Sequence, residues 1–344
     1  MSGPAADVAT GVMIECLEAL GPARRPLIVG EPSGRLAAAI RDAGGVPTLW
    51  LRQASEGAPQ AARAWPPDGS YDAALIRLPK AKEALDFALH ASAAHLAADA
   101  PIAVFGANAE GIRSVAGRLG EVAAGVETRS IRHHARVVVG LRRGQIDGLK
   151  PRLVDWRGVR EIEIDGARRR WISYPGTFAK GGLDLGTAQL LGHLPPVGRE
   201  ARILDFAAGT GVIAAALSAR APGAVIDMIE ADAVAIEAAR ENVPVARAIV
   251  GASLRAAGDA RYDLIVSNPP LHDGIAESRS VLDRLIADAP RHLRPAGRLV
   301  LVVQRRVPVL AALAKDLANP RILADDGSFT VAMAERATPE RRSS

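Results

Sequence analysis

The sequence predicts an α/β protein made of two tandem, doubly wound domains, each built around a mostly parallel sheet. In the second half, apolar runs of strand length alternate with helical segments at short spacing, which is the pattern of βαβ units. The first half repeats this order of elements, and Tyr71-Asp72 and Tyr262-Asp263 open corresponding strands. A length of 344 residues also suits two domains better than one core. We therefore interpret the chain as a duplicated domain.

The expected elements follow the chain in a regular order. In the second half we predict strands at 202–205, 224–229, 246–250, 262–267 and 297–303, with helices at 212–219, 233–242 and 281–292. In the first half we predict strands at 26–30, 46–51, 71–78 and 101–105, with a helix at 36–43. Two further strands, at 159–164 and 169–174, flank the Asp165-Gly166 turn and predict a hairpin between the halves. The expected boundaries are a first domain at 1–158, the hairpin and a connecting segment at 159–187, a second domain at 188–334 and a mobile tail at 335–344.

The composition is that of a globular enzyme without a membrane anchor. Hydrophobic residues make up 49% and charged residues 24%, which argues against disorder as the main state. No run of 18 apolar residues free of charge occurs, and the N-terminus lacks the basic and apolar regions of a signal peptide. Cys16 is the single cysteine, so an internal disulfide is excluded and no metal site is predicted. We expect a cytoplasmic monomer with no membrane partner.

The formal net charge of +5 is compatible with a nucleic-acid partner. Arg168, Arg169 and Arg170 follow the predicted hairpin turn and are our candidates for RNA contact; a solvated surface explains them equally well. A second arginine-rich stretch lies between residues 129 and 143. Aromatic residues make up only 3%, which limits base stacking. RNA binding should therefore rely on phosphates and be sensitive to salt.

The most specific motif is Asn268-Pro269-Pro270-Leu271, which follows the predicted strand at 262–267. Each proline lacks an N–H and fixes φ, so the backbone carbonyls have set directions. The Asn268 side-chain oxygen and a main-chain carbonyl can then accept both N–H groups of a planar amine. An isolated Asn-Pro-Pro is more often a plain turn. Here it follows a strand that runs into a glycine turn at 203–211, and the pair in this order is what an S-adenosylmethionine (SAM) methyltransferase acting on a planar nitrogen needs.

The glycine turn predicts the cofactor site. Ligands of open parallel sheets bind at the carboxyl ends of the strands, and a turn without Cβ atoms can pass close to them. The helix after Gly211 presents N–H groups to the SAM carboxylate. Glu230, at the end of the second strand, can accept bonds from both ribose hydroxyls. The predicted cofactor residues are Asp205, Ala207, Gly209, Gly211, Glu230, Ser253 and Asn268.

The first domain carries neither motif. Its glycine turn is replaced by 30–34, Gly-Glu-Pro-Ser-Gly, and the place of Asn-Pro-Pro is taken by 77–80, Arg-Leu-Pro-Lys. Two cations there would repel the positive sulfonium and offer an amino group no acceptor. We expect the first domain to be degenerate and non-catalytic, and to serve stability, substrate docking or both.

With these motifs the chain resembles the bacterial ribosomal RNA guanine-N2 methyltransferases of the small-subunit type over nearly its whole length. The resemblance rests on residues 77–82, 105–111, 174–187 and, above all, the segment 267–274, Ser-Asn-Pro-Pro-Leu-His-Asp-Gly. It implies two Rossmann-like methyltransferase domains, the N-terminal one degenerate. It also implies methyl transfer from SAM to the exocyclic N2 of a guanine in ribosomal RNA, free or in a ribosomal subunit. Asn268, Pro269, Pro270, Leu271 and His272 are the implied catalytic segment.

Two departures from the family pattern keep other functions open. Position 271 is usually aromatic, and Leu271 cannot stack on a flipped base. Ala207 and Ala208 replace a usual Gly-Cys; we expect alanine to cost little there if its backbone is right-handed or extended. One alternative is a methyltransferase for another planar nitrogen, in a protein or a small molecule. The other is a non-catalytic RNA-binding or ribosome-assembly factor. His272 can relay a proton, contact phosphate or simply hold the turn.

Overall fold

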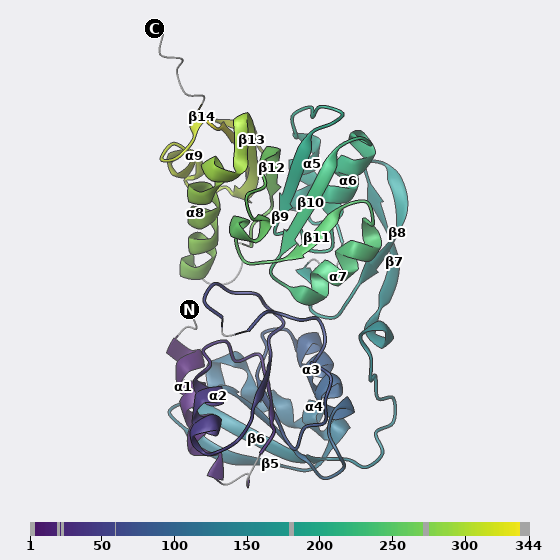
Figure 1. Cartoon of the computed structure of the whole chain (residues 1–344), viewed down its shortest axis with the longest axis vertical. Helices are drawn as coiled ribbons and strands as arrows, with labels where there is room; N and C mark the ends of the chain where they lie inside the picture. The colour runs from purple at the N-terminus through teal and green to yellow at the C-terminus, as the bar shows by residue number, and fades with distance from the viewer. Residues whose placement is uncertain are drawn as a thin grey trace. The chain divides into compact units, whose positions relative to one another are not determined.

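The computed structural model describes residues 4–18, 21, 24–58, 60–178, 182–270 and 275–337. Contacts divide the chain into two compact units, Met1–Arg157 and Gly158–Ser344 (Figure 1). Each unit is an α/β domain with its own sheet, so the predicted fold class and the tandem arrangement are confirmed. Within the described ranges, no helix is long and apolar enough to cross a membrane.

The second unit is built on a seven-stranded sheet of order β11-β10-β9-β12-β13-β15-β14. The strands are β9 (Arg202–Phe206), β10 (Val225–Glu230), β11 (Arg247–Val250), β12 (Tyr262–Ser267), β13 (Leu293–Gln304), β14 (Ala318–Asp325) and β15 (Phe329–Glu335). The first five are parallel and include every strand predicted for this half, whereas β15 pairs antiparallel with both β13 and β14. The helices are α5 (Leu185–Gly192), α6 (Val212–Arg220), α7 (Ala233–Asn242), α8 (Ile275–His292) and α9 (Val309–Leu313).

The core of the second unit lies on both faces of this sheet because strand side chains alternate. Leu264 and Val266 of β12 belong to the cluster that includes α6 and α7. Ile265 belongs to the opposite cluster, which includes α8 and α9. All three side chains are fully buried, and each stabilises the sheet by about 1.5–3 kcal/mol. The ends of the central strands are thereby held in fixed positions.

The first unit has a six-stranded sheet of order β2-β1-β3-β4-β6-β5. Its elements are α1 (Pro4–Glu15), β1 (Leu27–Val29), α2 (Arg35–Asp42), β2 (Thr48–Trp50), β3 (Ala74–Arg77), α3 (Lys82–Ala94), β4 (Pro101–Ala107), α4 (Val115–Val122), β5 (Ala123–Arg132) and β6 (Ala135–Arg142). The pairing matches that of the second unit: β1 lies between β2 and β3 as β9 lies between β10 and β12, and β6 and β5 follow β4 antiparallel. Among the residues described, nothing corresponds to β11.

The repeated Tyr-Asp pair has one role in both units. Asp72 accepts backbone N–H bonds from Arg24 and Arg25, at 2.7 and 2.8 Å, just before β1. Asp263 accepts the N–H of Arg202, at 2.8 Å, at the start of β9. In each sheet the carboxylate therefore fixes the beginning of the central strand, which supports the duplication read from the sequence.

The predicted hairpin is present as β7 (Gly158–Ile164) and β8 (Ala167–Ser173), a two-stranded sheet of its own. It belongs to the second unit, where Ile164 and Trp171 are buried in the cluster around α6 and α7. The hairpin is thus part of the core of this unit.

Candidate active site

The Asn-Pro-Pro motif and the glycine turn leave neighbouring strands at the same edge of the sheet. β12 and β9 are parallel, and their last residues, Ser267 and Phe206, lie opposite each other. The Ser267 hydroxyl donates a 2.7 Å bond to the Phe206 carbonyl and ties the two strand ends together. Asn268 and Ala207 therefore start adjacent loops at the carboxyl edge, where open parallel sheets bind ligands.

The side-chain amide of Asn268 has a fixed orientation. Its Nδ2 donates to Asp184 Oδ2 at 3.2 Å and Oδ1 at 3.4 Å, and to Thr187 Oγ1 at 2.9 Å. A carboxylate can only accept, so the NH₂ end must face Asp184. The Thr187 hydroxyl gives its own hydrogen to Asp184 Oδ2 at 2.5 Å, so it too can only accept from Asn268. The carbonyl oxygen of Asn268 is consequently turned away from this pair.

Asp184 is itself held by the start of α5. As the N-cap it accepts the N–H groups of Gly186 at 2.9 Å and Thr187 at 3.3 Å. Neither Asp184 nor Thr187 was among the site residues predicted from the sequence. An aspartate three residues before a threonine, directly ahead of an apolar run, was the available signal for a capped helix. Its proximity to Asn268 is a long-range contact that no local pattern encodes.

The glycine turn differs from expectation at two positions. Ala207 has φ of 59°, in the left-handed region that costs a residue with Cβ about 1–2 kcal/mol, so the condition under which alanine would cost little is not met there. Gly211 has φ of 90°, and a Cβ on it would come within 3.0 Å of Val243 and 3.3 Å of Met228. That Cβ would enter the core, so the glycine serves helix packing at the N-cap of α6. Gly209, by contrast, has nothing within 4 Å of a Cβ and borders open space.

Two acidic residues, Asp205 and Glu230, accept backbone N–H bonds in and just after the glycine turn. Asp205 is fully buried; its Oδ2 accepts the Ala214 N–H at 3.0 Å and its Oδ1 has no partner. Burial, with a smaller contribution from the charge of Glu230, raises the pKa of Asp205 to about 8. Glu230 accepts the N–H of Gly209 at 2.7 Å and of Asp232 at 2.9 Å, and burial raises its pKa as well. Glu230 therefore holds the glycine turn directly, whereas Asp205 holds the first turn of α6.

A pocket at this edge brings several predicted residues together. It is lined by Phe178, Gly182, Asp184, Thr187, Ala207, Ala208, Gly209, Thr210, Val212, Ile213 and Asn268. Ser253 is buried at the start of the short helix η6 (Leu254–Ala257) and does not line this pocket. Pro269 is buried and Pro270 exposed. Leu271 and His272 lie outside the described residues.

The three hairpin arginines do not form a single patch. In the β7–β8 register Arg168 lies opposite Glu163 and Arg170 opposite Glu161, whereas Arg169 lies opposite Ile162 on the other face. Because side chains alternate along a strand, adjacent arginines point to opposite sides. Arg168 and Arg170 are exposed, and each faces a carboxylate across the ribbon.

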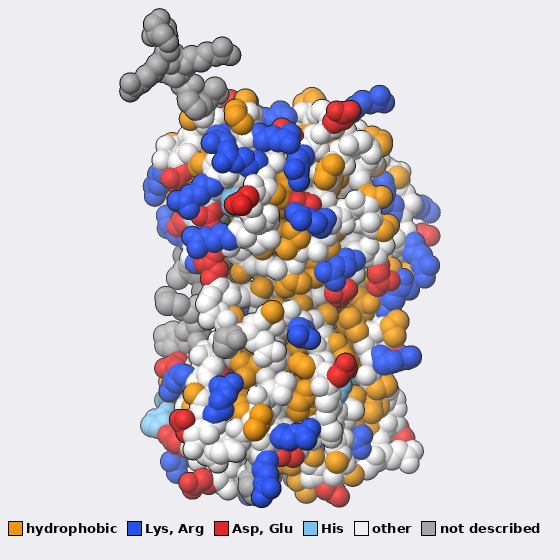
Figure 2. All heavy atoms as spheres, in the orientation of Figure 1, with side chains coloured by type: hydrophobic (Ala, Val, Ile, Leu, Met, Phe, Trp, Pro, Cys, Tyr) orange, Lys and Arg blue, Asp and Glu red, His pale blue; other side chains and the backbone are white. Residues whose placement is uncertain are grey.

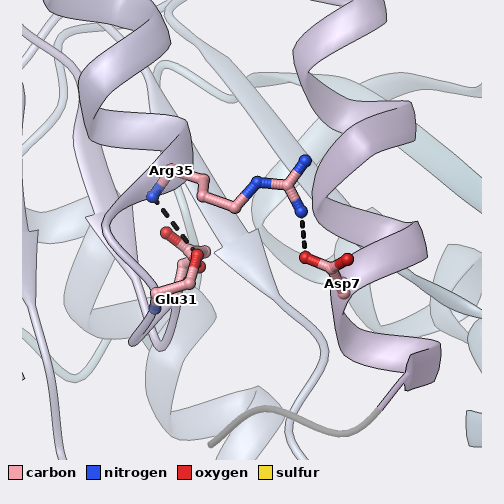
Figure 3. A network of polar contacts seen from close by, with 4 residues as sticks. Asp7, Glu31 and Arg35 are labelled. Carbon is pink, nitrogen blue, oxygen red and sulfur yellow. Dashed lines mark hydrogen bonds and ion pairs between the residues drawn. The ribbon is translucent and has the colours of Figure 1, made fainter.

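In the first unit, charged side chains stand at the corresponding edge. Arg77, in the place of Asn268, is buried, forms an ion pair with Glu110 and donates to the Leu78 carbonyl at 3.3 Å. Figure 3 shows Arg35 reaching from the start of α2 to an ion pair with Asp7 on α1. Glu31 is buried beside it and accepts the Ser33 N–H at 2.9 Å. An ion-paired guanidinium therefore occupies the place that the Asn268 amide has in the second unit.

Comparisons with known proteins match the two halves of the chain to two different family models. The methyltransferase small domain matches residues 169–333, and the methyltransferase small domain N-terminal model matches residues 23–135. Ribosomal RNA small subunit methyltransferase C of Ectopseudomonas mendocina is 32% identical, over 78% of this chain and 81% of the relative. The protein of the same name from Shewanella amazonensis is 29% identical over 78% of both chains.

A solved structure shares the whole fold. It is the 16S rRNA N2 methyltransferase of T. thermophilus in complex with AdoMet and guanosine, with a TM-score of 0.82 and 19% identity. The alignment covers 96% of this chain and 92% of that one, so both domains are included. The sequence relatives show that the chain belongs to the ribosomal RNA small subunit methyltransferase C family.

Proposed function

We propose that this protein transfers a methyl group from SAM to the exocyclic N2 of a guanine in the ribosomal RNA of the small subunit. The observation that carries the proposal is the orientation of Asn268, whose amide is fixed by Asp184 and Thr187 beside the glycine turn. Family membership supports the reaction, because the relatives are named for methylation of small-subunit RNA. The similar T. thermophilus enzyme was solved with AdoMet and guanosine, the two ligands that the proposal requires.

Asn268 performs the central positioning step. The lone pair of guanine N2 is delocalised into the ring, so the amine is planar and a weak nucleophile. Asn268 Oδ1 and the Pro269 carbonyl accept its two N–H bonds, favour a pyramidal nitrogen and aim the lone pair. The N–C bond then forms as the C–S bond breaks in line, and one N2 proton leaves to solvent or to a base, for which His272 is our candidate from the sequence. Most of the acceleration comes from orientation.

The residues at the turn fit SAM. When bound, SAM supplies an electrophilic methyl group on a positively charged sulfur. Gly209 leaves open space at the pocket, and the buried Asp205 Oδ1, on the strand that leads into the turn, has no partner. Glu230 ends β10 at the position suited to ribose hydroxyls, although it already accepts two backbone N–H bonds. Asp205, Ala207, Gly209, Gly211, Glu230 and Ser253 remain our proposed cofactor residues, with Gly211 acting through packing.

Basic residues at the same edge fit an RNA substrate. β13 pairs with β12 and leads into a surface hollow lined by Gln304, Arg305, Arg306, Gly327, Ser328 and Phe329. The Phe329 carbonyl accepts a 3.4 Å bond from Gln189 of α5, the helix that Asp184 caps. Figure 2 shows Lys and Arg side chains gathered over the part of the second unit that carries α8, α9 and β13. We propose that Arg305 and Arg306 contact RNA phosphates, together with the exposed hairpin arginines.

The target base must leave its helix, at a cost of a few kcal/mol that protein contacts have to offset. We further propose that the catalytic domain comprises the predicted 188–334 together with the segment 159–187, whose hairpin packs into the same core. Residues 1–158 form a non-catalytic domain, and the protein acts as a cytoplasmic monomer. This assignment keeps the chemistry in the unit with Asn268 and the glycine turn.

Titration calorimetry with SAM, followed by transfer of labelled methyl groups to small ribosomal subunits, tests the proposal. Wild type should bind SAM, and Glu230→Ala should bind it at least tenfold more weakly. Asn268→Ala should keep the wild-type affinity for SAM and lose transfer. Transfer to a protein or a small molecule, with none to RNA, would contradict the proposal.

A further inference from the structure

The glycine turn is anchored to the β7–β8 hairpin as well as to its own sheet. Trp171 Nε1, on β8, donates a 3.0 Å bond to the Thr210 hydroxyl. Trp171 is 1% exposed and Thr210 is 5% exposed, so this bond is shielded from water. Thr210 lies between Gly209 and Gly211 and lines the candidate cofactor pocket. Trp171, which precedes Thr210 by 39 residues in the sequence, thus contacts the middle of the turn.

Asn242, on α7, forms a second hydrogen bond to the same turn. At the end of α7, its Nδ2 donates to the Thr210 carbonyl at 3.0 Å and to the Ile172 carbonyl at 2.9 Å. Its Oδ1 accepts the Ile172 N–H at 2.8 Å. One amide therefore bridges β8 and the turn, and both the side chain and the backbone of Thr210 are held.

The turn needs such support. Gly209 and Gly211 both have positive φ, and glycine is the residue with the most backbone freedom. A carboxyl-edge turn that must fit a cofactor gains affinity when its bound shape is already fixed. The hairpin and α7 add to the support that Glu230 gives at Gly209, since Trp171 and Asn242 contact Thr210 without lining the pocket themselves.

We propose that Trp171 and Asn242 are positioning residues that set the glycine turn for the cofactor. The hairpin is then a functional part of the catalytic domain, in addition to any role in RNA binding. This inference rests on the proposed function, because it assigns SAM to the pocket at Thr210.

Trp171→Phe and Asn242→Asp test the proposal. The first keeps an aromatic ring in the core and removes the N–H donor. The second is nearly isosteric, keeps the acceptor for Ile172 and removes the donor to both carbonyls. Tyr174→Phe is the matched control: it removes a 3.0 Å bond from the Tyr174 hydroxyl to Glu241 on α7, without touching Thr210.

Trp171→Phe should raise the Kd and KM for SAM about fivefold to tenfold, the effect of one hydrogen bond, and Asn242→Asp, which loses two donated bonds, should raise them at least as much. In both variants, kcat at saturating SAM and RNA affinity should be nearly unchanged. In the free protein, amide hydrogen exchange at 207–211 should become faster. Tyr174→Phe should lower the melting temperature by about as much as the two test variants do. It should leave SAM affinity and exchange at the turn unchanged.

Wild-type exchange at the turn in both test variants would overturn the proposal, whether or not SAM binds. An equal loss of SAM affinity in Tyr174→Phe would also overturn it, because general destabilisation would then explain the result. Absence of SAM binding by wild type would instead contradict the proposed function, and the exchange measurement would still decide the role of the hairpin.

Discussion

Replacing Asp184 with asparagine should slow methyl transfer while leaving the fold and the cofactor affinity intact. Asp184 accepts bonds from the Asn268 amide, the Thr187 hydroxyl and two backbone N–H groups. Asparagine has the same shape and caps helices equally well, so α5 should keep its N-cap. One of its two side-chain ends, however, is a donor. If the asparagine oxygen keeps the N-cap bonds of Oδ1, its NH₂ group replaces Oδ2, and both the Asn268 amide and the Thr187 hydroxyl lose that acceptor.

The magnitude follows from the bond that is lost. A hydrogen bond to a charged group contributes about 1.5–3 kcal/mol, which now favours one orientation of the Asn268 amide. Without it the amide can rotate and present its NH₂ group to the amine of guanine, where donor meets donor. A loss of this size corresponds to a reduction in kcat of roughly 10-fold to 150-fold.

The assay is single-turnover methyl transfer to small ribosomal subunits at saturating SAM, with SAM Kd from calorimetry. Asp72→Asn is the matched control, because Asp72 also accepts two backbone N–H bonds but lies in the first unit. Asp184→Asn should keep SAM affinity within about twofold. A wild-type transfer rate would refute the claim that Asp184 orients Asn268, and a matching loss of SAM affinity would assign Asp184 to the cofactor.

Three further predictions concern stability and RNA binding. Ala207→Gly should raise the free energy of unfolding in urea by about 0.5–1 kcal/mol, because it relieves a left-handed alanine; a loss of stability would contradict the strain. Burial raises the pKa of Asp205 to about 8 in the folded protein. Between about pH 4 and pH 8, the folded protein therefore holds a proton that the unfolded chain has lost. Stability should therefore fall as pH rises from about 4 to 8, by up to about 1.4 kcal/mol per pH unit, and Asp205→Asn should flatten this slope. The double variant Arg305→Gln, Arg306→Gln should weaken RNA binding. It should also reduce the slope of log K against log salt concentration by about one for each lost phosphate contact. Arg240→Gln, an exposed control on α7, should change neither quantity.

The sequence predicted the parallel part of each sheet well, because buried strands and amphipathic helices leave strong periodic signals. The five strands from β9 to β13 lie where their apolar runs placed them. β14 and β15 were missed, since the first is largely exposed and follows the short helix α9. The predicted tail also began at residue 335, whereas Glu335 is the last residue of β15.

The site could be predicted only as far as its local motifs reach. Asn268 and the glycine turn stand out in the sequence, and the structure places both at the same pocket. The partners that orient them do not stand out: Asp184 meets Asn268, and Trp171 meets Thr210, through tertiary contacts. The conformation of Ala207 could not be read from its identity, because alanine usually avoids positive φ.

The most direct test of the role of Asn268 is nucleoside mass spectrometry of small-subunit RNA after incubation with SAM and either wild type or Asn268→Ala. We expect N2-methylguanosine with wild type and none with the variant, at equal SAM affinity. Methylation at another atom, or equal N2-methylguanosine from both proteins, would contradict the role assigned to Asn268.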